Sequence, residues 1–345
     1  MSAPRVSVIL PVRNDAGLVG GVLDAVLGSD APDGGLEVLV IDGMSEDGTR
    51  KLVAARAEQD ARVRLLDNPA RVIPAALNLG LAEARGAFVV RMDARALPDP
   101  DYVATAVELL EATGAANVGG PQRSVGEGRV GRAAAIATTS FFGVGDARFR
   151  FSEREEEVES VYLGAWRRET LEALGGWDET AEANEDYELN HRLIRDGGRV
   201  LLSPRLRCRY RVRERLPELA GQYLRYGRWK AAMLRRHPRS VRWRQLAAPA
   251  LVAGLALSAG LAPWRPRLAA VIPAAYGIAN VAASVAGAAR RDAGALPALP
   301  AVYAAMHVAW GAGFWAGLLG GDALRRNRAR SYPLGRPRRD RPVRR

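Results

Sequence analysis

The first 93 residues repeat one pattern: a short apolar run, then a longer segment in which apolar residues recur every three or four positions. The apolar runs predict strands and the periodic segments predict helices. Strands that alternate with helices of this length form an α/β fold with a mostly parallel sheet, covered on both faces. The predicted strands are 5–12, 36–42, 62–67 and 87–93, and the predicted helices are 16–28, 47–59 and 73–86.

The pattern is less regular over 117–180 and then resumes. A helix is predicted at 184–197, followed by two strands at 199–204 and 206–212. Residues 216–236 have the spacing of a basic amphipathic helix. This order predicts one α/β body that ends near residue 215.

The composition changes after residue 245, because 246–262, 268–289 and 293–321 contain no charged residue. A helix over 268–289 would be about 33 Å long, enough to cross a hydrocarbon core of about 30 Å. A buried helical subdomain is the alternative, but soluble helices of this length usually keep a charged face. We therefore expect a membrane region of two to three helices at 245–321, in which the first segment is the weakest span because it contains Pro249.

Charge is unevenly distributed along the chain, whose net charge is +12. Residues 1–224 hold 28 basic against 35 acidic side chains, 225–244 hold eight basic and no acidic ones, and 322–345 hold ten arginines against two aspartates. The positive-inside tendency places both basic flanks in the cytoplasm, which three full spans do not allow. One segment is therefore expected to be interfacial or re-entrant. The single cysteine, Cys208, suits a reducing compartment.

Acidic and polar residues follow the predicted strands where those strands end. They are Pro11 to Asp15, Asp42 with Gly43, and Asp93. In open α/β sheets, ligands bind at the carboxyl ends of the strands. The turn after the first strand lacks the glycine spacing of a dinucleotide site, and no P-loop motif is present. Carboxylates at this edge instead suit a base, ribose hydroxyls or a divalent cation on a diphosphate.

Six segments, taken in order, resemble the family-2 nucleotide-sugar glycosyltransferases, and most of all the exopolysaccharide type that synthesises succinoglycan. They are "VSVILPVRND", "VLVIDGMSEDGT", "NPARVIPAALNLGLAEARG", "VVRMDA", "GGWDETAEANEDYELNHRLIRDGG" and "QYLRYGRW". The resemblance implies a GT-A fold over 1–215, a nucleotide-diphosphate sugar donor (usually UDP), and inversion at the anomeric carbon.

The resemblance also implies roles for particular residues. Asp186 would be the general base that takes a proton from the acceptor hydroxyl. Glu185 would bind the acceptor or orient the loop, although this acidic pair could also be a simple helix start. The donor-binding residues would be Pro11, Arg13, Asp15, Asp42, Arg71, Asp93 and Arg95.

Arg95 changes what is expected of a metal. Most relatives have a second carboxylate two residues after Asp93, and a cation there would repel Mg²⁺ or Mn²⁺. Mg²⁺ or Mn²⁺ remains the expected cofactor, but it would be held more weakly, through Asp93 with water or another ligand. Arg95 or Arg71 would contact phosphate directly; alternatively, Arg95 points away from the site.

The segment 216–244 carries a motif similar to the family's Q-x-x-R-W, with tyrosine in place of tryptophan. Gln222, Arg225, Tyr226 and Trp229 would share one helix face. They are expected to bind the diphosphate and to stack on an acceptor sugar.

We therefore expect a multi-pass protein of the cell membrane whose catalytic domain is cytoplasmic. It would transfer a hexose, with glucose as the expected sugar, from a UDP-sugar to a lipid-linked saccharide. Transfer to polyprenyl phosphate is the nearest alternative. A non-enzymatic scaffold would bind no UDP, and a membrane-tethered nucleic-acid binder would use the arginine-rich tail 322–345. That tail, expected to be disordered, has only Tyr332 as an aromatic residue, so we expect membrane lipids and no nucleic acid as partners.

Overall fold

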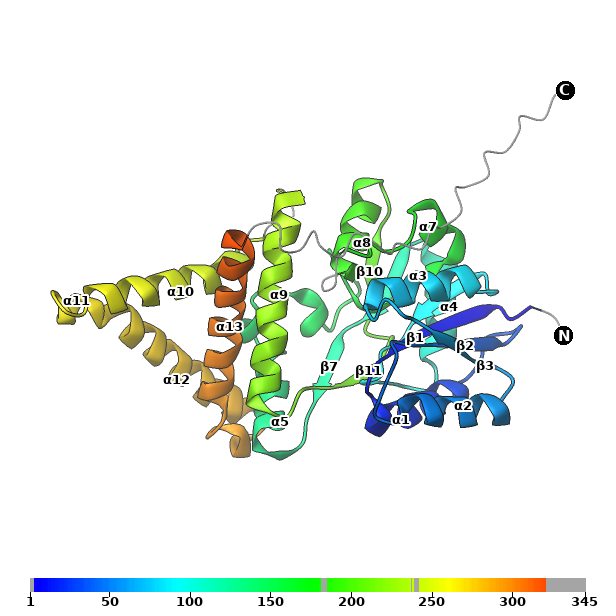
Figure 1. Ribbon diagram of the computed structural model, residues 1–345, viewed down its shortest axis with the longest axis horizontal. Coiled ribbons are helices and arrows are strands. Elements are labelled where there is room, and N and C mark those ends of the chain that lie inside the picture. Colours follow the sequence, from blue (N-terminus) through cyan, green and yellow to red (C-terminus); the bar gives the residue numbers. More distant parts are fainter. Residues whose placement is uncertain (1–2, 181–184, 237, 239–241, 321–345) are drawn as a thin grey trace, which may run out of the picture.

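The computed structural model describes residues 3–180, 185–236, 238 and 242–320 (Figure 1). The tail 322–345 lies outside the described residues. Within them, eight strands form a sheet in the order β3-β2-β1-β4-β9-β6-β10-β8, and three form a smaller sheet in the order β5-β11-β7. The strands are β1 Val6–Val12, β2 Leu36–Asp42, β3 Val63–Asp67, β4 Phe88–Arg91, β5 Ala96–Pro98, β6 Asn117–Gly120, β7 Gln122–Val125, β8 Glu156–Glu157, β9 Tyr162–Arg167, β10 Val200–Leu202 and β11 Cys208–Arg211.

Helices cover both faces of the large sheet and then continue beyond it. They are α1 Ala16–Leu27, α2 Thr49–Gln59, α3 Ile73–Glu83, α4 Tyr102–Thr113, α5 Gly128–Ala137, α6 Phe141–Val144, α7 Arg168–Ala173, α8 Glu185–Arg195, α9 Leu216–Arg236, α10 Arg244–Leu261, α11 Pro266–Ala269, α12 Val271–Arg291 and α13 Leu299–Leu319, with short 3-10 turns at Arg148–Arg150 and Ala293–Ala295.

The alternation in the first strand explains the two faces of the sheet. Val8 and Leu10 point into a core formed with α1, α2 and α4. Ile9, between them, points into a second core with α3, α7 and α8. Successive side chains of a strand face opposite ways, so an apolar run is buried on both sides. The predicted α/β fold with a mostly parallel sheet is confirmed.

The sheet is mixed at its centre. Strand β9 pairs antiparallel with both β4 and β6, and it comes from the stretch that showed no regular pattern. β1 pairs parallel with β2 and β4, and β2 with β3, so that their carboxyl ends lie at one edge. That edge faces α9 in Figure 1.

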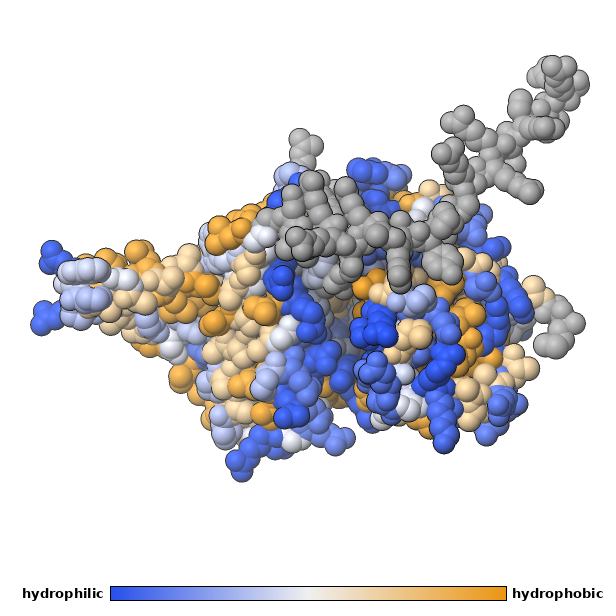
Figure 2. Space-filling model, in the orientation of Figure 1, coloured by the Kyte–Doolittle hydropathy of each residue, from blue (hydrophilic) through white to orange (hydrophobic). Residues whose placement is uncertain are grey.

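Beyond the sheet, α10 and α12 form a hairpin that projects from the body, whereas α13 runs alongside α9 (Figure 1). By length and composition, three helices in the described part of the chain can cross a membrane. Protein buries 11% of the window at α10 and 17% at α11–α12, but 39% at α13. From the sequence, the first segment is the weakest candidate for a membrane span. In the structure, α13 is the candidate helix that is most buried by other parts of the protein. The projecting hairpin is largely hydrophobic on the face shown in Figure 2.

Glycines bring α9 and α13 into backbone contact. A β-carbon on Gly227 would overlap the carbonyl oxygen of Trp310, and one on Gly313 would overlap that of Leu224. Small residues at such a crossing let two helices approach closely. The helix with the Q-x-x-R-Y motif is therefore fixed directly to an apolar C-terminal helix.

Replacing Gly227 with valine is expected to separate α9 from α13. Overpacking of this kind costs about 1–3 kcal/mol of stability, and it should also lower activity because α9 forms one wall of the site described below. Gly221→Val is the matched control, since its nearest neighbour is the flexible tip of Arg225 at 3.7 Å. Thermal unfolding in detergent measures both variants, and equal destabilisation would contradict the packing role.

Candidate active site

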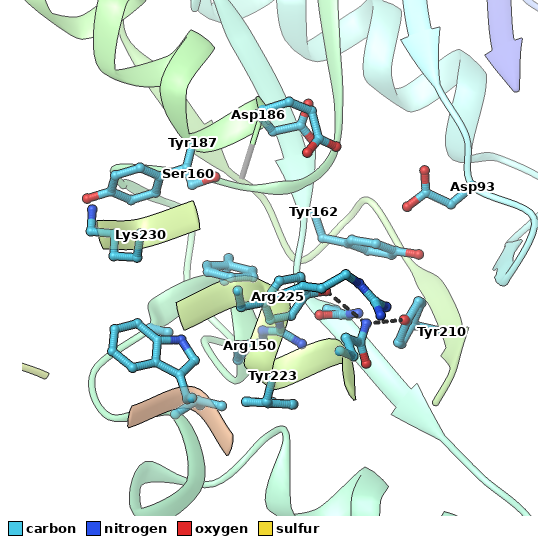
Figure 3. A pocket seen from close by; sticks show the side chains of 18 of the residues that line it. Asp93, Arg150, Ser160, Tyr162, Asp186, Tyr187, Tyr210, Tyr223, Arg225 and Lys230 are labelled. Atoms are coloured by element: carbon cyan, nitrogen blue, oxygen red, sulfur yellow. Dashed lines mark hydrogen bonds between the residues drawn. The ribbon is translucent and has the colours of Figure 1, made fainter. Parts of the chain in front are cut away.

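A cavity of about 990 Å³ lies at the carboxyl ends of the parallel strands, between the sheet and α9 (Figure 3). It brings together most of the residues that the sequence singled out. Those along its wall are Pro11, Arg13, Asp15, Arg71, Asp93, Arg95, Glu185, Asp186, Gln222, Arg225 and Tyr226. Asp42 and Trp229 are not among the lining residues.

The loops after the first three strands form one end of the cavity. Asp15 accepts a hydrogen bond from the amide of Arg13 at 3.0 Å, and its own amide donates to Thr49 at 2.8 Å. Burial raises the pKa of Asp15, and the Arg13 amide, Arg95 and Arg213 offset part of that rise. Arg71 adopts a positive φ of 61°, a conformation that non-glycine residues adopt mainly where function or packing demands it.

Asp42 lies behind this wall and not on it. It is fully buried, and its carboxylate accepts from the amide of Ser45 at 3.1 Å and from the hydroxyl of the same residue. Ile41 and Gly43 line the cavity on either side of it. The structure therefore does not place Asp42, which the sequence made a donor-binding residue, on the cavity wall; its carboxylate holds the loop after β2.

Arg91 is the central residue of the acidic group, and the sequence analysis missed it. Its side chain is only 6% exposed. Its Nε lies 3.0 Å from Asp93, and its Nη1 lies 2.8 Å from Glu185 and 2.6 Å from Asp186. Burial lowers the pKa of Arg91, but the three carboxylates, led by Asp186, raise it well above its ordinary value. One permanent cation thus orients three carboxylates from two distant parts of the chain.

Asp186 is partly accessible, because its side chain is 23% exposed, against 9% for Glu185 and 30% for Asp93. The indole N–H of Trp177 donates to its Oδ1 at 3.1 Å, while Arg91 contacts Oδ2. Both oxygens of the Asp186 carboxylate are therefore oriented by hydrogen-bond donors, while one edge of this carboxylate stays open to the cavity. Glu185 is buried against the guanidinium, which suits orientation of the loop better than contact with an acceptor.

Glu185 is expected to make stability depend on pH. Burial raises its pKa to about 7, partly offset by Arg91. The folded state then holds a proton more tightly than the unfolded state, so stability falls as pH rises from about 4.5 to about 7. Glu185→Gln should remove this dependence, which unfolding of both proteins at pH 5 and pH 8 would measure. Parallel pH profiles for the variant and the parent would contradict it.

The acidic group does not fit a divalent cation. Among the described residues, no three His, Cys, Asp or Glu side chains are grouped so that they could hold a metal. The Asp93 carboxylate is paired with Arg91, and Arg95 lines the cavity instead of pointing away. A metal at Asp93 would have to compete with two guanidinium groups.

The second wall comes from α9. Gln222 donates to the hydroxyl of Tyr226 at 2.8 Å, and both line the cavity. The next residue on this face is Lys230, four positions after Tyr226, instead of Trp229. The Lys230 side chain is buried, its Nζ lies 4.4 Å from the centre of the Tyr187 ring, and burial lowers its pKa to about 7.

The cavity is strongly positive. Among the described residues that line it, nine are arginine or lysine and four are aspartate or glutamate. Arg71, Arg95 and Arg225 make no ion pair with the described part of the chain. The buried Nε of Arg213 and hydroxyl of Tyr162 also lack a hydrogen-bond partner there. Unpaired donors around a basic cavity suit a ligand with several phosphate oxygens.

A sequence model described as glycosyl transferase family 2 matches residues 7–175. The succinoglycan biosynthesis protein ExoA of Rhizobium meliloti (strain 1021) is 34% identical over 90% of this chain and 94% of its own length. The chain therefore belongs to glycosyltransferase family 2, and it is a glycosyltransferase of the type that acts in exopolysaccharide biosynthesis.

Two other proteins are similar over most of the chain. A Methanococcus voltae protein, named as a dolichyl N-acetyl-α-D-glucosaminyl phosphate 3-β-D-2,3-diacetamido-2,3-dideoxy-β-D-glucuronosyltransferase, is 23% identical over 69% of this chain and 76% of its own. The solved mannosyltransferase PcManGT from Pyrobaculum calidifontis, in complex with GDP-Man and Mn²⁺, has a TM-score of 0.59 at 24% identity and covers 92% of this chain and 88% of that one. This structure shows the GT-A fold.

Proposed function

We propose that the protein transfers a hexose from a UDP-sugar, with inversion, to a lipid-linked saccharide at the cytoplasmic face of the cell membrane. Glucose is the expected hexose. The observation that carries the proposal is that one cavity contains both an oriented, accessible carboxylate and unpaired cations, next to apolar helices. The carboxylate suits an acceptor alcohol, and the cations suit a departing diphosphate.

The donor would occupy the end formed by the loops after the first three strands. Pro11, Arg13 and Asp15 line a space suited to the base and ribose. Arg71 and Arg95 line the same space, where their guanidinium groups would bind the diphosphate and neutralise the charge that grows as it departs. Asp93, on the far side of Arg91, would face the ribose or the sugar.

Asp186 would take the proton from the acceptor hydroxyl while that oxygen attacks the anomeric carbon. Arg91 and Trp177 hold the carboxylate in one orientation, which keeps the reacting atoms aligned. Positive charge develops on the sugar ring in such transfers, and the nearby carboxylates stabilise it. A single displacement inverts the configuration at that carbon.

The arrangement of the helices supports an even number of membrane spans. At 18 and 21 residues, α10 and α12 are about 27 and 32 Å long, close to the thickness of a hydrocarbon core. Arg265 and Arg267 lie at the tip of the hairpin, where they would reach the far headgroups. With α13 held against α9 at the near surface, both basic flanks would lie on the cytoplasmic side.

The proposed transfer is tested by supplying membranes that contain the protein with a panel of radiolabelled UDP-sugars. Label from one UDP-hexose should enter the lipid extract, and it should not do so in membranes that lack the protein. Transfer from no UDP-sugar, with no UDP binding, would contradict the proposal. The Methanococcus voltae relative, whose name includes a dolichyl-linked sugar phosphate, supports a lipid-linked acceptor.

Transfer to polyprenyl phosphate is the second candidate. It is favoured by the fact that both oxygens of Asp186 already have donors, Trp177 and Arg91. A phosphate oxygen is ionised at neutral pH and needs no base, so this reaction would survive Asp186→Asn.

Removal of divalent cations is expected to leave most of the activity. The reason is that Arg71 and Arg95 supply the charge that a metal would otherwise provide at the diphosphate. The initial rate of label transfer is compared before and after exhaustive chelation. Complete loss that added Mg²⁺ or Mn²⁺ restores would contradict this prediction and would make Asp93 the expected metal ligand.

A further inference from the structure

Part of the cavity wall, named the apolar arm, comes from α6, α10, α12 and α13, and the proposed reaction does not use it. Its lining is aromatic and aliphatic and consists of Phe141, Phe142, Val144, Leu251, Met306 and Trp310, together with Tyr276 and His307. We propose that this arm binds the hydrocarbon chain of the acceptor lipid, whose phosphate group then lies at Lys230. This inference rests on the proposed transfer to a lipid-linked acceptor.

Two polar side chains inside the arm, Tyr276 and His307, are hydrogen-bonded to each other. The two ring nitrogens of His307 lie 2.9 Å from the hydroxyl of Tyr276 and 2.9 Å from the carbonyl oxygen of Phe142. Phe142 also packs edge-on against the rings of Tyr303 and His307, with centroids 4.9 and 5.0 Å away. A wall of mostly hydrocarbon side chains, with its tyrosine and histidine hydrogen-bonded, favours an apolar chain, at roughly 0.8 kcal/mol for each buried CH₂ group.

Two of the helices that bound the arm, α10 and α12, are the apolar helices that protein covers least. Leu257 on α10 is 60% exposed and Ile278 on α12 is 73% exposed. These outer faces require lipid around them. A lipid chain would therefore reach the arm laterally, between helices that already lie in its own solvent, without crossing water.

Basic residues lie where the arm meets the reaction chamber. In Figure 3, Lys230 stands beside Tyr187 on one side of the cavity and Asp93 lies on the other side, with Asp186 and Arg225 between the two sides. Arg150 also lines this junction, above the ring of Phe149 at 4.9 Å. Along the cavity, the apolar arm is followed by the cations, and the cations by Asp186 and the donor end. A lipid-linked saccharide has the same order, with its hydrocarbon chain followed by phosphate and then by the acceptor sugar.

Burial lowers the pKa of Lys230 to about 7, so an arriving phosphate group would favour its charged form. Lys230 also follows Gly227 by about one helical turn of α9, and Gly227 is where α9 contacts α13 at Trp310. The phosphate site and the apolar arm are thus on directly contacting helices.

The test is photo-labelling of the full-length protein in membranes with a polyprenyl diphosphate that carries a diazirine in its chain. Labelled peptides should come from α6, α10 and α13. Excess unlabelled polyprenyl diphosphate should compete, and inorganic diphosphate should not. Leu251→Trp, which fills the arm, should lower this labelling about tenfold. Leu257→Trp, on the same helix but outside the cavity, should leave it unchanged.

Labelling confined to the outer faces of α10 and α12 would overturn the inference, as would equal labelling of the arm by a diazirine phosphatidylcholine. So would an unchanged signal in Leu251→Trp. Equilibrium binding of UDP separates this outcome from failure of the proposed function. If UDP binds and a hexose is transferred while the arm stays unlabelled, only the lipid arm is wrong; if the arm is labelled but no UDP-sugar serves as donor, the proposed transfer fails.

Discussion

Asp186→Asn is expected to lower the rate of hexose transfer by about 10²–10⁴-fold, the usual contribution of a positioned general base. Asparagine keeps the size of the side chain, and its one amide oxygen can still accept a hydrogen bond from either Trp177 or Arg91. It cannot take a proton from the acceptor hydroxyl. Binding of UDP should therefore be nearly unchanged, and the measurements are the rate of label transfer to lipid and the affinity for UDP.

Asp196→Asn is the matched control, because Asp196 is half exposed, pairs with Arg195 and lies outside the cavity. It should retain full activity. Full activity of Asp186→Asn itself would contradict the base assignment and would favour a phosphate acceptor.

Arg91→Met is expected to abolish most activity and to destabilise the protein by about 3–5 kcal/mol, the typical result of removing one partner of a buried ion pair. Three carboxylates would then face one another without a counter-charge. Residual activity should have its acid limb shifted to higher pH, because the ionised carboxylates lose their stabilising cation. Chemical unfolding and the pH profile of kcat/KM measure the two effects.

Arg195→Met removes an exposed ion pair at the end of α8, the helix that carries Glu185 and Asp186, and should change stability by less than about 1 kcal/mol. Arg91→Lys separates charge from geometry, because one ammonium cannot contact three carboxylates as a guanidinium does. It should fold better than Arg91→Met and remain poorly active. An Arg91→Met enzyme with an unshifted pH profile would reduce Arg91 to a purely structural role.

Much of the N-terminal part of the large sheet could be predicted from the sequence because its signals are local. Buried parallel strands are continuous apolar runs, as in β1 and β2, and their carboxyl ends necessarily meet at one edge. Strand β9 could not be predicted in this way. Its place between β4 and β6 depends on pairing with residues far away in the chain, and its own sequence, with Gly164 in its interior, has a weak strand signal.

The residues of the site also divide into those that the sequence predicted and those that it did not. Asp186 and Arg225 were found through a resemblance, whereas Arg91 was hidden because a charged residue in an apolar strand gives no indication of its partners. The arginine itself was a signal, because a buried strand rarely contains an arginine unless acidic side chains pair with it. On α9, the sequence predicted that Trp229, three residues after Tyr226, would face the site. In the structure, the residue that lines the cavity is Lys230, four residues after Tyr226.

The central claim is that one cavity binds the nucleotide sugar with its diphosphate against the unpaired arginines and its anomeric carbon toward Asp186. An experimental structure of the protein with UDP bound tests it most directly. We expect the base at Arg13 and Asp15, the diphosphate within hydrogen-bonding distance of Arg71 or Arg95, and Asp186 on the open side of the β-phosphate. UDP bound outside this cavity, or with its phosphates directed away from these arginines, would contradict the account.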